Sequence, residues 1–241
     1  IAVHVYYQGL INRVWNSGDY RQGMIAQVHV DDEIVLVTDS TWKYSISKAW
    51  KSGGVVGYDT QFLENIDSRL MEPHWKSLDF DDSHWEQIYE NHADDHELYI
   101  QPTPPVDVYR IEPKEVIGIA SGHYLIDFGQ EITGQFIMEA RGKSGQVIEI
   151  RCAEELDSDN RARYKMRCNC DYQEFWTLSG RQKDILEFYD YKAFRYVEVI
   201  GPEESMDKDS FGAIVRHYPM DEDSYVFETS DKLLNSIWEI C

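Results

Sequence analysis

The sequence predicts an all-β protein with two antiparallel β-sandwich domains, followed by the start of a helix. Short runs rich in β-branched and aromatic residues recur between positions 116 and 215, with turn residues between them, which is typical of a sandwich. No strand–helix–strand alternation interrupts these runs, which argues against a parallel nucleotide-binding sheet. Pro102, Pro104 and Pro105 predict a stiff, extended link between the two domains.

The domain boundaries follow from these changes in pattern. We place the first sandwich at residues 1–100, the proline-rich linker at 101–112, the second sandwich at 113–219 and the start of a helical domain at 220–241. Gly142-Lys143-Ser144-Gly145 predicts a hairpin loop in the second sandwich. The strands expected there are Val116–Ile119, Tyr124–Phe128, Gln135–Ala140, Val147–Ile150, Glu174–Leu178, Leu186–Phe188, Phe194–Ile200 and Phe211–Val215.

The first domain shows weaker patterns. Met24–Val30 and Glu33–Val37 predict a hairpin with Asp31-Asp32 at its tip. Three glycines between Lys51 and Gly57 predict a flexible link. The apolar spacing of Tyr58–Leu70 also suits a short amphipathic helix, but we expect this segment to be extended.

Two segments carry structural tryptophans. Phe80-Asp81-Asp82-Ser83-His84-Trp85 predicts a turn whose tryptophan packs down on a sheet. Ser230–Glu239 predicts a helix capped by Thr229 or Ser230. Its residues Leu233, Leu234, Ile237 and Trp238 form one apolar face, and such a face needs a packing partner.

Charge and composition exclude several classes of function. The formal net charge of −21 repels nucleic-acid phosphates, so we expect no nucleic-acid partner. No apolar run approaches the ~20 residues of a membrane span. The chain begins without methionine inside an expected strand and stops inside an expected helix, so both ends look cut and any signal peptide would lie outside it.

The four cysteines are Cys152, Cys168, Cys170 and Cys241. Cys168 and Cys170 are two residues apart on an expected strand, a spacing that disfavours a disulfide between them, while Cys152 could reach one of them from a neighbouring strand. A Cys-x-Cys pair can also bind metal, but the other ligands of a zinc site are missing nearby. Reduced thiols and a cytoplasmic location are the expectation.

Common catalytic motifs are absent from the sequence. It has no Gly-x-Ser-x-Gly elbow, no phosphate-binding loop and no His-Glu-x-x-His, and Gly129–Gly134 has glycine spacing without a following helix. The carboxylates of Asp79, Asp81 and Asp82 keep a bound structural calcium ion as an alternative, although the sequence lacks the residue spacing of a calcium-binding loop. We therefore expect no cofactor and no metal site.

An ordered series of motifs resembles bacterial α-L-rhamnosidases. The series is Asp127-Phe128-Gly129-Gln130, Gly134, Arg151-Cys152-Ala153-Glu154, Tyr172, Trp176-Thr177-Leu178-Ser179-Gly180 and Phe194-Arg195-Tyr196-Val197-Glu198-Val199. Upstream, Phe62–Arg69 and Phe80–Trp85 resemble the preceding domain of that family, with departures at Leu63, Ile66 and Ser68. The resemblance runs over nearly the whole chain and implies non-catalytic sandwiches of the jelly-roll or galactose-binding-like kind.

The resemblance also implies a role. Enzymes of this family remove terminal α-L-rhamnose by inversion, with acid and base on an (α/α)6 barrel, and the helix near Ser230 resembles the entry to that barrel. The chain would then scaffold the barrel as its partner, contact rhamnosides through the complete enzyme and be inactive by itself. We assign no catalytic residue.

Candidate binding residues remain. Trp50, Tyr58 and Trp75 lie in loop-like sequence and offer faces on which sugar rings stack, although a core or interdomain role fits them as well. The charged and polar residues Asp127, Gln130, Glu154, Arg195 and Glu198 are expected to form an internal network that holds strand ends and docks the barrel. Two alternatives to the accessory role are a carbohydrate-binding module that works alone and a structural domain for docking or homodimerisation.

Overall fold

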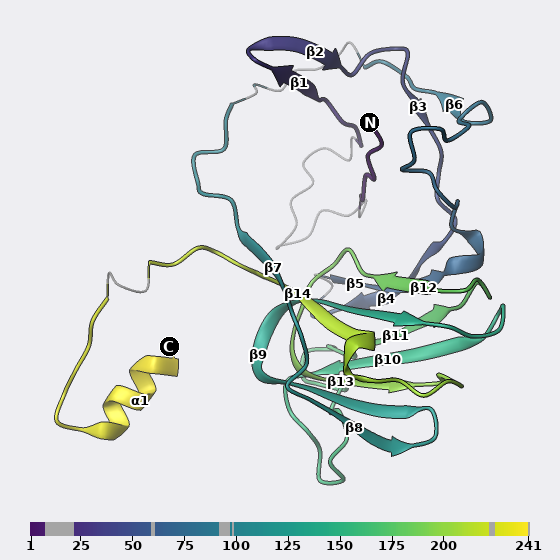
Figure 1. Cartoon of the computed structure of the whole chain (residues 1–241). Coiled ribbons are helices and arrows are strands. Elements are labelled where there is room, and N and C mark those ends of the chain that lie inside the picture. The colour runs from purple at the N-terminus through teal and green to yellow at the C-terminus, as the bar shows by residue number, and fades with distance from the viewer. Residues whose placement is uncertain (8–21, 59–60, 92–96, 98, 222–224, 241) are drawn as a thin grey trace.

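The computed structural model describes residues 1–7, 22–58, 61–91, 97, 99–221 and 225–240 (Figure 1). Two short 3-10 turns, Ser68–Leu70 and Lys208–Ser210, and one helix, α1 at Lys232–Ile240, accompany the strands. None of the helices in these ranges is long and apolar enough to cross a membrane. The strands are β1 (Gln27–Val30), β2 (Glu33–Val37), β3 (Lys43–Tyr44), β4 (Trp50–Val56), β5 (Gln61–Asp67), β6 (Glu86–Gln87), β7 (Asp107–Ile111), β8 (Glu115–Ala120), β9 (His123–Ala140), β10 (Val147–Ala153), β11 (Gln173–Thr177), β12 (Asp184–Glu187), β13 (Lys192–Ile200) and β14 (Phe211–His217).

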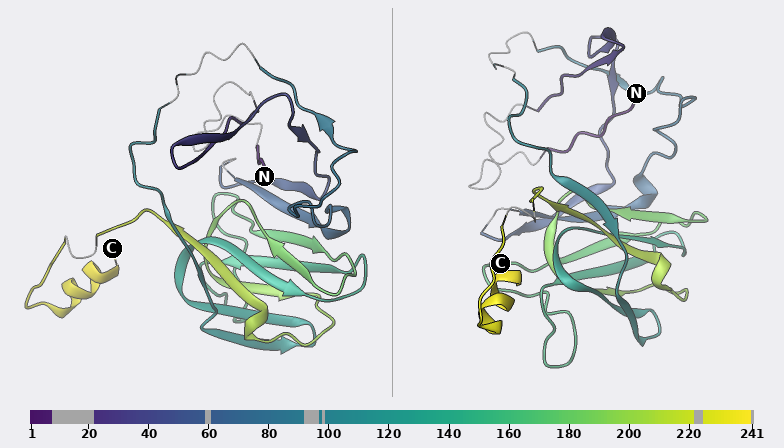
Figure 2. Two further views of the ribbon diagram at one scale, coloured as in Figure 1. Left: turned by 45° about the horizontal axis from the view of Figure 1, so that its top comes forward. Right: turned by 60° about the vertical axis from the view of Figure 1, so that its left-hand side comes forward.

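One ten-stranded sheet makes the body of the protein. Its order is β4-β5-β11-β10-β13-β9-β14-β7, and β8 and β12 also pair with β9. Every pairing is antiparallel except that of β5 with β11, which is parallel. The sheet folds over on itself into two layers, and the expected all-β class is confirmed (Figures 1 and 2). Strands β4 and β5, which the sequence places in a separate first sandwich, belong to this sheet, and the other described N-terminal strands form two-stranded pairs.

Strand β9 joins the two layers. It runs without a break through Tyr124–Phe128 and Gln135–Ala140, which the sequence predicts as two separate strands. Its start pairs with β8, its end pairs with β12 and β14, and β13 pairs with it from His123 to Gly134. Gly134 sits at the crossing, where a Cβ atom would lie 2.2 Å from the Ile214 carbonyl oxygen, so the backbones approach closely there because the side chain is missing.

The core lies between the layers. Phe136, Trp176, Phe194 and Phe211 come from four different strands and are all fully buried. The Trp176 indole N–H donates to Ser68 Oγ at 2.8 Å, which satisfies its polar atom inside the core. Strand alternation accounts for these positions, because inward-facing residues recur at every second place.

The glycine-rich segment between Lys51 and Gly57 is a strand, and the prediction of a flexible link is wrong. It forms β4 and pairs with β5, with a bulge between Ser52 and Val55. Gly54 lies in this bulge at φ 115°, a conformation that only glycine adopts readily. Gly53 and Gly54 therefore serve the bulge.

The extended conformation expected for Tyr58–Leu70 is confirmed over β5. This strand joins the large sheet, because Ile66 pairs with Trp176 and Asp67 with Thr177 of β11. Strand β5 thus pairs with a strand that lies more than 100 positions later in the chain, and β4 reaches the sheet through β5.

Two further expectations are wrong. The loop Gly142–Gly145 is not a hairpin, because it connects β9 to β10 and β13 lies between those strands in the sheet. The linker expected at residues 101–112 ends earlier than predicted, because β7 begins at Asp107 and pairs with β14. The missing signal in both cases is the identity of the partner strand, which a local pattern does not contain.

The remaining N-terminal elements form an arch over one end of the sandwich (Figure 2). The β1–β2 hairpin is confirmed, with Asp31 and Asp32 at φ 49° and 66° as a two-residue turn requires. Strands β3 and β6 make a second small pair. The turn at Phe80–Trp85 forms through Asp81, and the Trp85 ring packs on Phe80 with ring centroids 5.5 Å apart.

Helix α1 stands away from the sandwich (Figures 1 and 2). Its cap is Asp231, whose Oδ1 accepts from the Leu233 and Leu234 N–H groups at 2.8 and 3.4 Å, and the expected caps Thr229 and Ser230 are wrong. Its apolar residues are exposed, and the Trp238 ring stacks on Phe227 with centroids 5.1 Å apart.

Candidate functional site

An aromatic cluster joins the N-terminal segment to the edge of the large sheet. The His4 ring contacts Trp50 and Trp75 edge-on, with centroid distances of 4.9 and 5.8 Å. Tyr189, in the loop between β12 and β13, contacts His4 and Trp50, and Tyr6 stacks on it at 5.4 Å. We call His4, Tyr6, Trp50, Trp75 and Tyr189 the aromatic junction.

The aromatic junction contains an unpartnered donor. The Trp50 indole nitrogen is buried and has no hydrogen-bond partner among the described residues, and a buried polar atom of this kind calls for a ligand or water. Burial, followed by the positive charge of Lys76, lowers the pKa of His4. Tyr189 donates or accepts a hydrogen bond at His4 Nδ1. The surface thus combines flat aromatic faces with polar groups.

Two of the three predicted sugar-contact residues meet in this junction. Trp50 and Trp75 both contact His4, whereas Tyr58 lies apart, is 62% exposed and accepts a hydrogen bond from the Cys168 thiol. His4, Tyr6 and Tyr189 were not predicted for this site. Their positions depend on packing between segments that are far apart in the sequence, so no local pattern indicates them.

Asp127 and Arg195 form a two-pronged ion pair. Arg195 Nε and Nη2 donate to the two Asp127 carboxylate oxygens at 2.8 and 2.9 Å, and the Gly129 N–H donates to Asp127 Oδ1 at 2.6 Å. The hydrogen bond from Arg195 is the main reason why the pKa of Asp127 is lowered. The Arg195 guanidinium also lies 4.8 Å from the centre of the Tyr196 ring. This pair ties β13 to β9 beside a break in their register.

Glu198 is the centre of a second group. It is 1% exposed, and its carboxylate accepts from His123, from Arg161 at 3.3 Å and from the Ala162 N–H at 3.2 Å. These contacts pin the segment after β10 over the outer face of β13. A buried carboxylate with several donors is the arrangement that makes such burial tolerable.

The predicted network therefore consists of two groups. Gln130 and Glu154 are exposed, and in the described ranges neither side chain makes a hydrogen bond to these groups. Asp127 with Arg195, and Glu198 with its donors, each hold neighbouring strands together, which is a structural role.

A third polar group inside the sandwich was not predicted. Lys192 Nζ donates to Glu174 Oε1 at 2.8 Å, and their side chains are 4% and 1% exposed. Burial is the largest single effect and lowers the pKa of Lys192, but the charge and hydrogen bond of Glu174, together with the nearby Cys152 and Glu64, outweigh it and the net shift is upward. The alternation of side chains along a strand could have indicated these two buried charges, because Glu174 lies on the same strand face as the core residue Trp176, and Lys192 on the same face as Phe194.

Glu64 completes this buried group. Its two carboxylate oxygens accept from the Tyr189 and Asp190 N–H groups at 2.8 and 3.1 Å. Burial is the main cause that raises the pKa of Glu64 to about 7. A carboxyl group with such a pKa is typical of a catalytic acid, but Glu64 is 4% exposed and faces backbone donors, so it holds the 189–190 turn.

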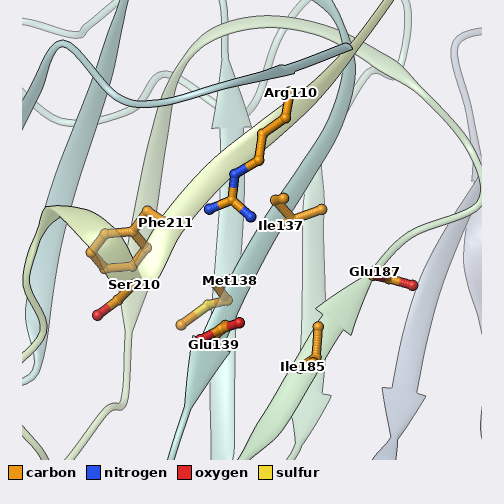
Figure 3. A pocket seen from close by; sticks show the side chains of 8 residues that line it. All are labelled: Arg110, Ile137, Met138, Glu139, Ile185, Glu187, Ser210 and Phe211. Carbon is orange, nitrogen blue, oxygen red and sulfur yellow. The ribbon is translucent and has the colours of Figure 1, made fainter. Parts of the chain in front are cut away.

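Two surface hollows in the described part of the chain are small. One, of about 120 Å³, lies on the β9–β14 face, and Figure 3 shows Arg110 reaching over it toward Ile137 and Met138. The other, of about 270 Å³, lies between Tyr44 and Trp85. Pockets that bind small-molecule ligands usually have volumes of about 300 Å³ or more. Within the same residues no cluster of three metal-binding side chains occurs.

Two family descriptions match the chain. The α-L-rhamnosidase N-terminal domain matches residues 6–110, and the concanavalin-like domain of bacterial α-L-rhamnosidase matches residues 117–217. An α-L-rhamnosidase of Formosa agariphila is 26% identical over 224 residues, which cover 86% of this chain and 22% of that protein. An α-L-rhamnosidase of Streptomyces avermitilis is 25% identical over 222 residues, which cover 90% of this chain and 21% of that protein.

A solved structure shows the same fold. The α-L-rhamnosidase from Dictyoglumus thermophilum superposes with a TM-score of 0.66 at 27% identity, over 86% of this chain and 23% of that chain. The chain therefore spans about a fifth of the length of these relatives.

Proposed function

Because the chain belongs to the bacterial α-L-rhamnosidase family through both an N-terminal domain and a concanavalin-like domain, we propose that it is the accessory region of an α-L-rhamnosidase. The matches confirm the resemblance seen in the ordered motifs. In this proposal the complete enzyme removes terminal α-L-rhamnose from glycosides or polysaccharides by inversion, and this region carries none of the reacting carboxylates.

The exposed face of α1 is the observation that carries the proposal. Leu233, Leu234, Ile237 and Trp238 of α1 are 42–69% exposed, and none of them belongs to the core cluster that the described residues form. An apolar face of this size is stable in water only when it is covered. We propose that it packs against the helical catalytic barrel of the same enzyme and that the sandwich scaffolds this barrel.

An assay with an aryl α-L-rhamnoside tests this role. We expect no hydrolysis by this chain and hydrolysis by a longer polypeptide that also carries the barrel. In the longer polypeptide, Leu234→Lys with Ile237→Lys should reduce the yield of folded enzyme, while Lys232→Ala on the same helix should not. Hydrolysis by this chain alone would overturn the proposal.

A second candidate function is sugar contact at the aromatic junction, favoured by the unpartnered indole N–H of Trp50. Titration with L-rhamnose and a short rhamnosyl oligosaccharide should then show saturable binding, with calcium and with a chelator in parallel. Trp75→Ala should abolish it, whereas Tyr58→Ala, outside the junction, should leave it unchanged. If no binding is detected at millimolar concentrations of sugar, sugar contact at the aromatic junction is excluded and the scaffold role remains.

A third candidate is self-association of the chain through α1, giving a homodimer. Light scattering over a range of concentrations would then show growth in mass, and Leu234→Lys would suppress it. A mass that stays at the monomer value at every concentration would exclude this.

We also propose a cytoplasmic location. Cys152, Cys168 and Cys170 are free thiols, as cysteines are kept in reducing compartments, and Cys241 lies outside the described residues. Fractionation of the source cells would test this, and recovery of the protein from the secreted fraction would contradict it.

A further inference from the structure

We propose that Cys168 and Cys170 are a reversible dithiol–disulfide pair, which would make the turn between Arg167 and Cys170 a thiol modification site. The spacing of these cysteines on a strand would disfavour a bond between them, but the structure does not place them on a strand. It places them on a tight turn.

The turn geometry brings the two residues together. The Cys170 N–H donates to the Arg167 carbonyl oxygen at 3.2 Å, and Cys168 and Asn169 have φ values of 63° and 61°, so this is a two-residue hairpin turn of type I′. Lys165 pairs with Asp171 on the flanking segments. Cys168 and Cys170 are joined through Asn169, whose left-handed backbone bends the chain, so their Cα atoms lie closer than the roughly 7 Å of a fully extended chain. This is compatible with the Cα separation of about 4.4–6.8 Å found in disulfides.

Both thiols also face the same part of the protein. The Cys168 thiol donates to the Tyr58 hydroxyl at 2.7 Å. Cys170 lies against Tyr172, whose hydroxyl donates to Gln61 at 3.0 Å. Tyr58 follows β4 and Gln61 begins β5, so both cysteines contact groups that are tied to the β4–β5 pair.

The two cysteines differ in access. Cys168 is exposed, whereas Cys170 is partly buried, and burial raises the pKa of the Cys170 thiol. An exposed thiol next to a second one that is less accessible is the arrangement of redox-sensitive pairs. Cys168 is therefore the attacking residue and Cys170 the resolving residue.

The reaction balances with a small disulfide such as oxidised glutathione as the oxidant. The Cys168 thiolate attacks one sulfur of this disulfide and expels a first glutathione thiolate, which leaves a mixed disulfide on Cys168. Cys170 then attacks the Cys168 sulfur and expels the second. Two protein thiols are oxidised, one disulfide is reduced to two thiols, and the two protons pass to the departing thiolates.

Oxidation would change a contact between distant segments. The Gly57 and Tyr58 N–H groups donate to the Asn169 and Cys168 carbonyl oxygens, both at 3.2 Å, so the turn holds the end of β4 in place. The disulfide removes the thiol hydrogen that bonds to Tyr58. A disulfide in so short a ring is strained, so we expect it to be easily reduced.

Peptide mapping tests the pair. The chain with Cys241→Ser is equilibrated in glutathione buffers from reducing to oxidising, quenched in acid, alkylated and cut with trypsin. Cleavage after Arg167 and Arg181 gives one peptide that holds Cys168 and Cys170 without Cys152. In the oxidising buffers we expect this peptide to carry no alkyl group and to be lighter by two hydrogen atoms, and dithiothreitol should restore both alkylation sites.

Two variants separate the roles. Cys170→Ser should leave glutathione trapped on Cys168 in the same buffers, and Cys152→Ala should behave like the parent chain because Cys152 is buried. The proposal is overturned if the peptide keeps two alkyl groups in oxidising buffer, carries two glutathiones, or is found linked to a second chain.

Discussion

Glu174 accepts a hydrogen bond from the Glu64 main-chain N–H at 2.9 Å, which joins the parallel strands β5 and β11 through a buried carboxylate. The same oxygen atom accepts from Lys192 at 2.8 Å. Since β5 has only two ladder partners on β11, Ile66 with Trp176 and Asp67 with Thr177, this side chain extends the attachment of the β4–β5 hairpin to the sheet.

Replacing Glu174 should be strongly destabilising. Glu174→Gln leaves the Lys192 ammonium buried without its counter-charge, and breaking a buried pair in this way costs about 3–5 kcal/mol of the free energy of unfolding. Urea unfolding followed by tryptophan fluorescence measures this. The control is Lys143→Met, which breaks the exposed pair with Glu203 and should cost less than about 1 kcal/mol. Equal losses in the two variants would contradict the buried role of Glu174.

Glu64 should make stability fall as the pH rises. Burial raises the pKa of Glu64 from its usual 4.5 to about 7, so the folded protein keeps this proton where the unfolded chain has lost it. The contribution to the free energy of unfolding is fully present below about pH 4.5 and is lost as the pH rises through about 7. A shift of this size corresponds to roughly 3 kcal/mol.

The comparison of Glu64→Gln with the parent chain checks this. The variant cannot ionise, so its stability relative to the parent should improve between pH 5 and pH 8 in urea unfolding. Glu112→Gln, at an exposed position, is the control and should show no such trend. A constant difference between Glu64→Gln and the parent at all pH values would mean that Glu64 does not titrate in this range.

Gly134 should tolerate no side chain. A Cβ atom there would lie 2.2 Å from the Ile214 carbonyl oxygen, so Gly134→Ala must push β9 and β14 apart. Overpacking of this kind costs about 1–3 kcal/mol or more. Gly118 in β8 has nothing within 4 Å of its Cβ position, and Gly118→Ala should stay within about 0.5 kcal/mol of the parent. Thermal unfolding of both variants decides, and a tolerated Gly134→Ala would show that the strands can separate freely.

Arg195→Lys should weaken the link between β13 and β9. A lysine has no fork with which to bond both Asp127 oxygens, so one of the two hydrogen bonds at 2.8 and 2.9 Å is lost. We expect a loss of about 1 kcal/mol in urea unfolding. Arg163→Lys, beside the exposed Glu155, is the matched control and should change little. If the two substitutions change the free energy of unfolding by the same amount, the two-pronged geometry of the Arg195–Asp127 pair does not contribute to stability.

Sequence patterns predict much of the local structure. Apolar alternation locates the strands around Trp176 and Phe194, and the Asp31-Asp32 pair locates the β1–β2 turn. The ordered motifs predict the family, because a series of short matches in a set order is far more specific than any one match. These signals lie within a few residues of one another, so they can be read without knowing how the chain folds back.

The partners of the strands and the make-up of the candidate sites depend on the tertiary structure. Alternation says which face Glu64 presents but not that β11, about 110 positions later, supplies Glu174 beside it. In the same way, only the folded chain brings His4 between Trp50 and Trp75. Such pairings are non-local, and the residues that make them carry no mark of their partner in the surrounding sequence. The sequence by itself therefore determined the all-β class, most strand positions and the family, whereas packing between distant segments decided which side chains share a buried charge, an aromatic cluster or a turn.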